Sequence, residues 1–161
     1  MNMGSESKKE KAHEHMKEAA EVASKSTCGR ARCGSIIVKN DEIIGKGYNS
    51  PPRNKEENKR CSNSKKLYHK KVTDKTCCVH AEQRAIMDAL KRNPDKIQGS
   101  ILYFARINEK GEIKPSGKPY CTICSKMALD VGISKFVLQH EKGIKFYDTK
   151  EYNDLSFQYK I

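Results

Sequence analysis

Hydrophobic and polar positions along the chain follow two periods, and their order predicts the first elements of secondary structure. Between residues 5 and 27, alanines and Met16 recur at helical spacing among many Lys and Glu residues, which predicts an amphipathic helix. Residues 34–38 and 43–48 are apolar runs on either side of a short polar turn, a pattern typical of a β-hairpin. The pattern therefore predicts one helix followed by two paired strands.

The second half of the chain alternates helices and strands. Residues 81–92 join strong helix formers with one apolar face, and Asn93 and Pro94 provide a typical stop, so a helix is predicted there. A strand, a helix that ends at Gly132 and a further strand are predicted, in that order, for residues 100–106, 121–131 and 135–139. Residues 141–161 form an aromatic-rich C-terminal tail, which we expect to pack on the core.

A long polar segment interrupts this order at residues 50–78. It has few apolar residues and an excess of Lys and Arg over Glu and Asp, and it contains Cys61 and His69. Loops of this length are uncommon in compact domains unless they are functional, metal-bound or disordered. We therefore expect an insertion within a single domain of residues 1–161, whose N-terminal helix occupies residues 1–27. The order of the elements predicts an α/β fold in which helices cover a sheet.

Composition narrows the class of protein. No apolar stretch reaches the roughly 18 to 20 residues that a membrane span needs, and the N-terminal segment lacks the apolar centre of a signal peptide, so a soluble, cytoplasmic protein is expected. The odd count of seven cysteines favours metal ligation over a disulfide scaffold. The formal charge of +12 leaves nucleic acid open as a partner but does not favour it, because no basic motif interleaved with aromatic residues accompanies it.

Two short motifs carry the candidate chemistry, and each lies where a predicted helix begins. His80 precedes the helix of residues 81–92, and Cys121 and Cys124 stand at the start of the next helix. A helix N-terminus and a bound zinc ion both favour the thiolate form of cysteine. One imidazole and two thiolates make the three-ligand set of a catalytic zinc ion, with the fourth position open for water.

Glu82, two residues after His80, is the predicted proton carrier. Bound zinc lowers the pKa of water from 15.7 to about 7. Glu82 would accept the proton that this water releases, deliver it to the ring nitrogen beside the attacked carbon, and later protonate the leaving ammonia. The joint pattern H-x-E and P-C-x-x-C is the known signature of zinc-dependent deaminases.

Two alternatives stay open for these residues. Cys121 and Cys124 could form a redox pair, although the preceding sequence has no thioredoxin-like pattern. Zinc could instead be structural, with Cys77 or Cys78 as its fourth ligand. Glu82 would then have no chemical purpose.

Over residues 28–140 the chain resembles the cytidine and deoxycytidylate deaminase superfamily, and most closely the deoxycytidylate deaminases. Beyond the zinc motifs, residues 28–38 (CGRARCGSIIV) and residues 47–51 (GYNSP) are similar to the family's first-strand entry and its G-Y-N stretch. The resemblance implies a three-layer α/β/α fold with a central mixed five-stranded sheet and helices on both faces. It also implies zinc as cofactor and homo-oligomers.

The resemblance further implies residue roles. Asn49 is the expected substrate contact, and the backbone N–H of Ala81 and the segment around Tyr120 are expected to line the same pocket. A second, structural zinc ion is implied near the insertion, with ligands drawn from Cys28, Cys61, His69, Cys77 and Cys78. The alternative is a set of free thiols.

The chain departs from the family pattern at one place that bears on the substrate. Tyr120 stands between Pro119 and Cys121, where Pro directly precedes the first cysteine in most relatives, and the connection of residues 107–118 is longer than usual. The metal spacing is intact, so it is substrate identity that the departure puts in doubt.

The leading hypothesis is therefore zinc-dependent hydrolytic deamination of a free cytosine nucleotide or nucleoside, with dCMP to dUMP the first choice. Cationic residues that could hold a monophosphate are Arg30, Arg53 and Lys118. A polynucleotide deaminase acting on tRNA adenosine or single-stranded cytosine is the second hypothesis, suggested by the positive charge. A catalytically silent module that binds zinc and a nucleotide is the third.

Overall fold

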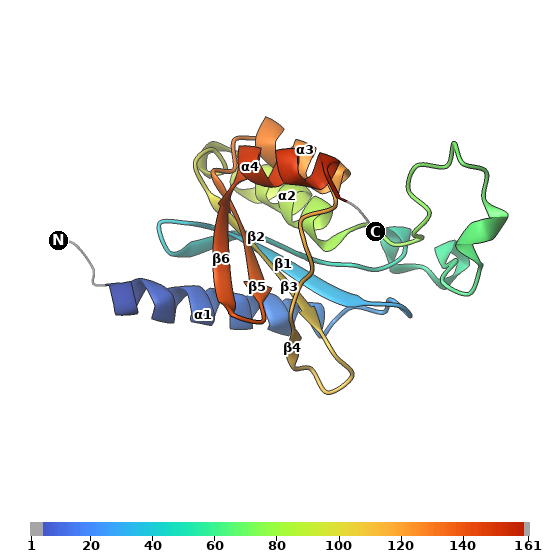
Figure 1. Ribbon diagram of the computed structural model, residues 1–161, viewed down its shortest axis with the longest axis horizontal. Helices are drawn as coiled ribbons and strands as arrows, with labels where there is room; N and C mark the ends of the chain where they lie inside the picture. The colour runs from blue at the N-terminus through green and yellow to red at the C-terminus, as the bar shows by residue number, and fades with distance from the viewer. Residues whose placement is uncertain (1–4, 160–161) are drawn as a thin grey trace.

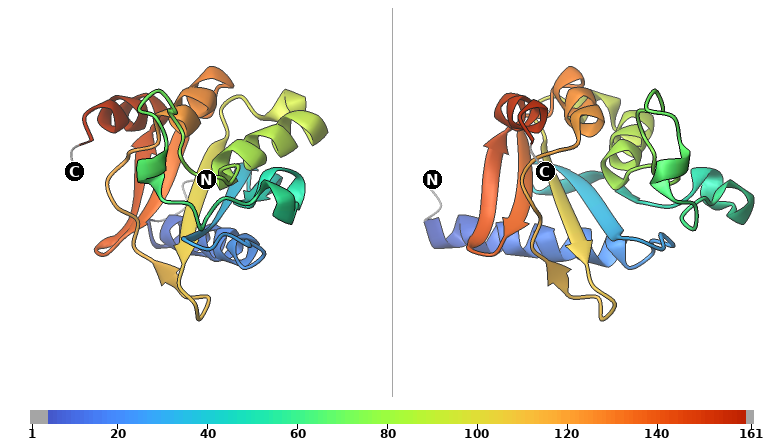
Figure 2. Two further views of the ribbon diagram at one scale, coloured as in Figure 1. Left: turned by 90° about the vertical axis from the view of Figure 1, so that its right-hand side faces the viewer. Right: turned by 45° about the vertical axis from the view of Figure 1, so that its right-hand side comes forward.

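The fold places one mixed β-sheet between two layers of helices. A computed structural model describes residues 5–159 (Figure 1). Helix α1 covers one face of the sheet, and helices α2, α3 and α4 cover the other, as the two further views of Figure 2 also show. The predicted three-layer α/β/α fold is confirmed. The helices are α1 Ser5–Ala23, α2 Ala81–Arg92, α3 Thr122–Asp130 and α4 Thr149–Phe157.

The central sheet has the strand order β2-β1-β3-β5-β6, with a short strand β4 paired to the end of β3. Strands β3 and β5 run parallel, and the other pairs are antiparallel. The strands are β1 Arg32–Lys39, β2 Glu42–Tyr48, β3 Ile101–Ile107, β4 Ile113–Lys114, β5 Lys135–His140 and β6 Gly143–Asp148. The five-strand core agrees with expectation, and its fifth strand comes from the tail that the sequence pattern left unassigned.

Helix α1 lies close against the sheet because glycine and alanine face each other there. Met16 and Ala19 are fully buried in a cluster with Ile36 of β1 and Val137 of β5. A Cβ atom on Gly34 would stand 2.2 Å from the carbonyl oxygen of Ala19. Only glycine lets helix and strand approach to this distance.

The opposite face holds the larger part of the core. Ile37, Ile86, Leu102 and Phe136 are fully buried there, and burial of each such side chain stabilises the fold by roughly 1.5–3 kcal/mol. Tyr152 of α4 stacks on Phe136 with ring centroids 3.9 Å apart. The expected packing of the tail on the core holds for Tyr147 and Tyr152, whereas Phe146, Phe157 and Tyr159 are exposed.

Helix boundaries differ slightly from the sequence pattern. Helix α1 ends at Ala23 rather than near residue 27, and the Ser24 hydroxyl donates to the carbonyl oxygen of Glu21 at this end. Helix α2 has the predicted bounds. No helix within residues 5–159 combines the length and apolar character needed to cross a bilayer.

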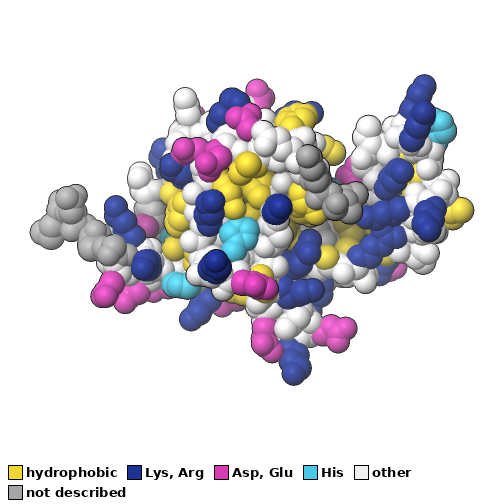
Figure 3. Space-filling view, viewed as in Figure 1, with side chains coloured by type: hydrophobic (Ala, Val, Ile, Leu, Met, Phe, Trp, Pro, Cys, Tyr) yellow, Lys and Arg dark blue, Asp and Glu magenta, His cyan; other side chains and the backbone are white. Residues whose placement is uncertain are grey.

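The segment between β2 and α2 extends away from the body of the fold (Figure 1). Its regular structure consists of three short 3-10 turns, Pro52–Asn54, Glu56–Asn58 and Lys65–Leu67. Figure 3 shows Lys and Arg side chains gathered on this part of the surface. The two ends of the segment meet where the Val79 N–H donates to the carbonyl oxygen of Ser50 at 2.9 Å.

Candidate metal centre and active site

The two sequence motifs meet at the N-terminal ends of α2 and α3. His80 is the residue before α2, Cys121 is the residue before α3, and Cys124 lies in the first turn of α3. The His80 Nδ1 atom lies 3.2 Å from Cys124 Sγ and 3.4 Å from Cys121 Sγ. All three ligand atoms lie within 4.8 Å of one another.

The capping interactions of the two helices explain this placement. The His80 N–H donates to the Gln83 side-chain oxygen at 3.0 Å, which is half of a capping box and begins α2 at the next residue. Cys121 Sγ accepts from the Cys124 N–H at 3.4 Å. Each helix start therefore holds its ligands on the side that faces the other helix.

The donor set fits a zinc ion. Zinc stands about 2.3 Å from cysteine sulfur and about 2.0 Å from imidazole nitrogen, so one ion can contact three atoms spaced as these are. Hydrogen bonding from Cys124 and His80, opposed by burial, lowers the pKa of Cys121 to about 5. The lowered pKa favours the thiolate form of Cys121, which is the form that binds metal.

Glu82 lies in the first turn of α2 and is buried, with 6% of its surface exposed. Burial, with a further contribution from Cys121, raises its pKa to about 7. A carboxyl group with a pKa near the working pH can both accept and donate a proton. The geometry thus places a buried carboxyl group with a raised pKa beside the candidate metal group.

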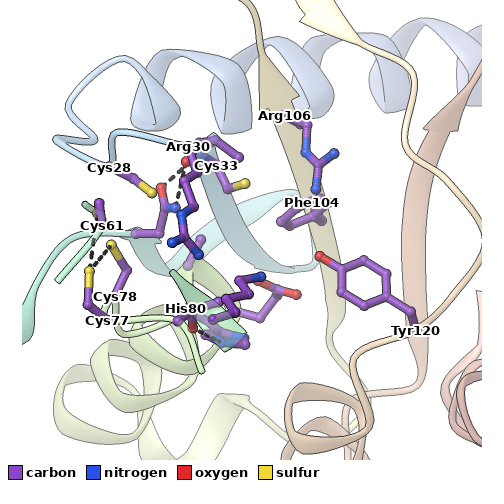
Figure 4. Close-up of a pocket in the computed structure, with 16 residues that line it drawn as sticks. Cys28, Arg30, Cys33, Cys61, Cys77, Cys78, His80, Phe104, Arg106 and Tyr120 are labelled. Atoms are coloured by element: carbon purple, nitrogen blue, oxygen red, sulfur yellow. Dashed lines mark hydrogen bonds between the residues drawn. The ribbon is translucent and has the colours of Figure 1, made fainter. Parts of the chain in front are cut away.

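A cavity of about 240 Å³ opens beside Glu82 and His80 (Figure 4). Phe104 and Tyr120 lie on one side of it, and a group of cysteine side chains lies on the other. The residues that line the cavity are Cys28, Arg30, Ala31, Cys33, Asn49, Cys61, Lys65, Thr76, Cys77, Cys78, His80, Ala81, Glu82, Phe104, Arg106 and Tyr120.

Asn49, the expected substrate contact, lies in the wall of this cavity with its amide held in place. Its Oδ1 atom accepts from the Ser26 hydroxyl at 2.6 Å and from the Cys33 N–H at 2.8 Å. Its Nδ2 atom donates to the carbonyl oxygen of Ala31 at 2.7 Å. Because Nδ2 carries two hydrogens, one remains for a ligand.

The other two expected contacts line the same cavity. Ala81 is buried as the first residue of α2, where backbone N–H groups have no partner within the helix. Tyr120 is 49% exposed, and its ring centroid lies 5.7 Å from that of Tyr159. The structure thus brings Asn49, Ala81 and Tyr120 together with Glu82 and His80.

A second group of thiols lies in the same cavity wall. The Sγ atoms of Cys28, Cys61 and Cys78 lie within 4.8 Å of one another, and Cys77 Sγ is 3.2 Å from Cys61 Sγ. His69 lies outside this group: it is exposed, and its Nδ1 atom accepts from the Lys71 N–H at 3.1 Å. Cys28, Cys61 and Cys78 thus offer three sulfur ligands of the kind that structural zinc ions use, with Cys77 close by.

The three cations proposed for a phosphate group lie in different places. Arg30 lines the cavity, together with Lys65 and Arg106, which the sequence pattern did not single out. Arg53 lines a separate hollow between β2 and α2. Lys118 lines a small hollow whose wall also includes Glu82 and Tyr120.

Asp74 is another residue that the sequence reasoning missed. Its Oδ2 atom lies 3.1 Å from the Nε2 atom of His80, and Thr76 Oγ1 lies 3.3 Å from the same nitrogen. Both residues come from the insertion. The only sequence signal was a carboxylate a few residues before the motif histidine.

Comparisons with known proteins agree with this geometry. A family model of the cytidine and deoxycytidylate deaminase zinc-binding region matches residues 9–140. The deoxycytidylate deaminase of Saccharomyces cerevisiae is 31% identical over 131 residues, which are 76% of this chain and 35% of that protein. The deoxycytidylate deaminase of Schizosaccharomyces pombe is 32% identical over 79 residues, 46% of this chain and 24% of that protein. This chain thus spans 35% and 24% of the length of these curated relatives.

Among solved structures, the dCMP deaminase of the cyanophage S-TIM5 in complex with dCMP and dUMP is similar, with a TM-score of 0.56 and 27% identity. The match covers 84% of this chain and 82% of that chain. Because the family model extends over most of the chain and includes both motifs of the metal group, the chain belongs to the cytidine and deoxycytidylate deaminase zinc-binding family.

Proposed function

We propose that this chain removes the exocyclic amino group of a cytosine nucleotide by hydrolysis of its C–N bond, with dCMP as substrate and dUMP and ammonia as products. The observation that carries the proposal is the convergence of His80, Cys121 and Cys124 beside the buried carboxyl group of Glu82 in one cavity. Similarity to the yeast and cyanophage deoxycytidylate deaminases supports this choice of substrate.

The metal ligands are proposed to be His80, Cys121 and Cys124. When bound there, zinc lowers the pKa of a coordinated water so that hydroxide is available at neutral pH. Glu82 takes up the proton that the water loses and delivers it to N3 of the cytosine ring. It then takes the proton of the hydroxyl group added at C4 and passes it to the amino nitrogen, so that the C4–N4 bond breaks and water and cytosine give uracil and ammonia.

Residues in the walls of the cavity are proposed to orient the substrate. The remaining Nδ2 hydrogen of Asn49 and the backbone N–H of Ala81 are donors for the sugar and the base. The Phe104 ring gives the base an apolar surface. Arg30 and Lys65 are the proposed contacts of the 5′-phosphate, because a phosphate is bound best by charged donors.

A second zinc ion is proposed at Cys28, Cys61 and Cys78, with Cys77 as the nearest further sulfur. Cys28 precedes β1, whereas the other three thiols belong to the insertion or its end. An ion bound here would fasten the insertion to the body of the fold. With Cys77 as the fourth ligand the site would be closed, with no open position for water, so the role of the ion would be structural.

One observation favours a polynucleotide substrate as the second candidate. Residues 50–78 carry nine Lys and Arg residues against three Asp and Glu residues, and they border the cavity. Phosphate contacts from such a segment would make binding fall steeply with added salt. A single nucleotide would show a much weaker dependence.

Ammonia release tests the proposal. Wild-type protein and Glu82→Ala are compared on dCMP, deoxycytidine, CMP, cytidine, a tRNA anticodon stem and single-stranded DNA. We expect turnover of dCMP, and we expect the variant to retain zinc and lose turnover. Activity in Glu82→Ala equal to wild type would contradict the assigned proton carrier, and purified protein without zinc would contradict the metal site.

A further inference from the structure

Arg84 of α2 donates hydrogen bonds to several backbone carbonyl groups of the loop that follows β2. Its Nη1 atom donates to the carbonyl oxygen of Tyr48 at 3.1 Å, and its Nη2 atom donates to the carbonyl oxygens of Pro51 at 3.0 Å and Ser50 at 3.3 Å. The Ser50 hydroxyl is a further acceptor. The guanidinium carbon lies 5.8 Å from the centre of the Tyr48 ring.

These contacts fall on both sides of Asn49. The carbonyl groups of Tyr48 and Ser50 belong to the residues directly before and after it, so the guanidinium group fixes the backbone from which the Asn49 side chain projects. Opposite Arg84, the Asn49 N–H donates to the carbonyl oxygen of Cys33 at 3.2 Å. Asn49 is therefore held between strand β1 and helix α2.

The same helix carries the chemistry. His80 precedes α2 and Glu82 lies in its first turn, and Arg84 follows within one further turn. A helix is a rigid element, so the position of the Arg84 guanidinium relative to His80 and Glu82 is set by the helix itself. Binding the loop through Arg84 thus sets the distance of Asn49 from the proton carrier and the metal ligand.

Arginine is suited to this arrangement and lysine is not. Both terminal nitrogens of the planar guanidinium group donate to neutral oxygens, Nη1 to Tyr48 and Ser50 and Nη2 to Pro51. A guanidinium offers five N–H donors in a fixed fork, whereas an ammonium is a compact charge on a flexible stem. Lysine at this position could reach part of the acceptors but could not hold them in one plane.

We propose that Arg84 is a positioning residue that holds Asn49 at the substrate cavity. The inference rests on the proposed function, because Asn49 contacts substrate only if the cavity takes a cytosine nucleotide. Arg84 acts through Asn49 and does not touch substrate. Loss of Arg84 therefore weakens substrate binding by releasing the loop.

A double-mutant cycle, measured as KM and kcat for dCMP, tests whether Arg84 acts through Asn49. Arg84→Ala and Asn49→Ala are each expected to raise KM for dCMP about tenfold with a smaller change in kcat, because each removes a hydrogen-bonded contact. If Arg84 acts through Asn49, the double variant matches Asn49→Ala alone. Arg84→Lys is expected to lie between wild type and Arg84→Ala. Lys91→Ala, which removes an exposed cation from the same helix, should change neither constant. Additive effects in the double variant would overturn the inference.

Amide hydrogen exchange tests the same inference without substrate. In Arg84→Ala and Arg84→Lys, amides of residues 47–54 should exchange faster than in wild type and Lys91→Ala, while amides of β3 keep their protection. Unchanged exchange in residues 47–54 would overturn the positioning role, whether or not the protein deaminates dCMP. Faster exchange in a protein that deaminates none of the tested compounds would leave Arg84 as the anchor of the loop and would count against the proposed function alone.

Discussion

Asp74 contacts one nitrogen of the His80 ring, and the two candidate cysteine ligands lie at the other. Asp74 Oδ2 lies 3.1 Å from His80 Nε2, while His80 Nδ1 faces the two sulfurs. Thr76 Oγ1 lies 3.3 Å from the same nitrogen, so Nε2 has polar partners while Nδ1 is turned toward the candidate metal position. A residue of the insertion thus contacts the histidine of the core motif and can orient its ring.

Removal of this carboxylate should weaken metal binding. Asp74→Ala is expected to lower zinc affinity by about 10-fold to 100-fold, measured by competition with a chromophoric chelator, because the ring loses the partner that orients it. Glu57→Ala removes an exposed carboxylate from the same insertion and should leave the affinity unchanged. Equal affinities in Asp74→Ala and wild type would show that the contact does not support the metal.

The cluster of Cys28, Cys61 and Cys78 leads to a separate prediction about the number of bound zinc ions. Cys61→Ser is expected to lower bound zinc from two ions to one per chain and to reduce the melting temperature, as measured by elemental analysis and calorimetry. His69→Ala should keep both ions, because His69 is exposed and lies outside the thiol group. One ion in the wild type, or loss of an ion in His69→Ala, would contradict this ligand set.

Part of this site could be predicted from the sequence and part could not. His80, Glu82, Cys121 and Cys124 belong to short motifs at predicted helix starts, so local spacing was enough to find them. Asp74, Ser26 and Arg84 act through contacts between segments distant from one another or through the fold of an irregular loop. Such contacts leave no periodic signal in a single sequence.

The secondary structure, like the site, could be predicted from the sequence only in part. Helix α2 has a strong apolar face and was predicted with its observed bounds. Strand β6 lies at the edge of the sheet, where only Tyr147 is buried, so the strand lacks the alternation of apolar and polar residues that predicts a strand. Tertiary packing, through the Tyr147 and Tyr152 rings, decides the structure of this tail.

Close packing of β2 on α2 predicts the effect of a single methyl group. In Gly47→Ala the added Cβ would stand 2.6 Å from the backbone nitrogen of Ala85 and 2.8 Å from the carbonyl oxygen of Ala81. Strand and helix must separate, at a cost of about 1–3 kcal/mol in the free energy of unfolding, measured with urea. Gly117→Ala meets no atom within 4 Å and is the matched control. Equal stability of the two variants would show that β2 can move away from α2 freely.

Tyr103 predicts a pH dependence of stability. Burial raises the pKa of Tyr103 from 10.0 to about 12, so the unfolded chain loses this proton at lower pH than the folded chain. Stability should therefore fall as pH rises from about 10 to about 12, by an amount on the order of 1–3 kcal/mol for this group. Tyr103→Phe should show a shallower decline over that range in urea unfolding. Parallel stability curves for wild type and Tyr103→Phe would contradict the assignment.

The proposed phosphate contact can be separated from the general positive charge of the insertion. Lys65 lines the cavity, whereas its neighbour Lys66 does not. Because a cation that meets the 5′-phosphate has no partner on a nucleoside, Lys65→Ala should lower kcat/KM for dCMP about tenfold and leave deoxycytidine unaffected. Lys66→Ala removes the same charge one residue away and should change neither substrate. If both variants lose activity on dCMP equally, the insertion attracts the nucleotide by its overall charge, and Lys65 is not a specific contact. If only Lys65→Ala loses it, the insertion supplies part of the substrate site as well as the support of His80.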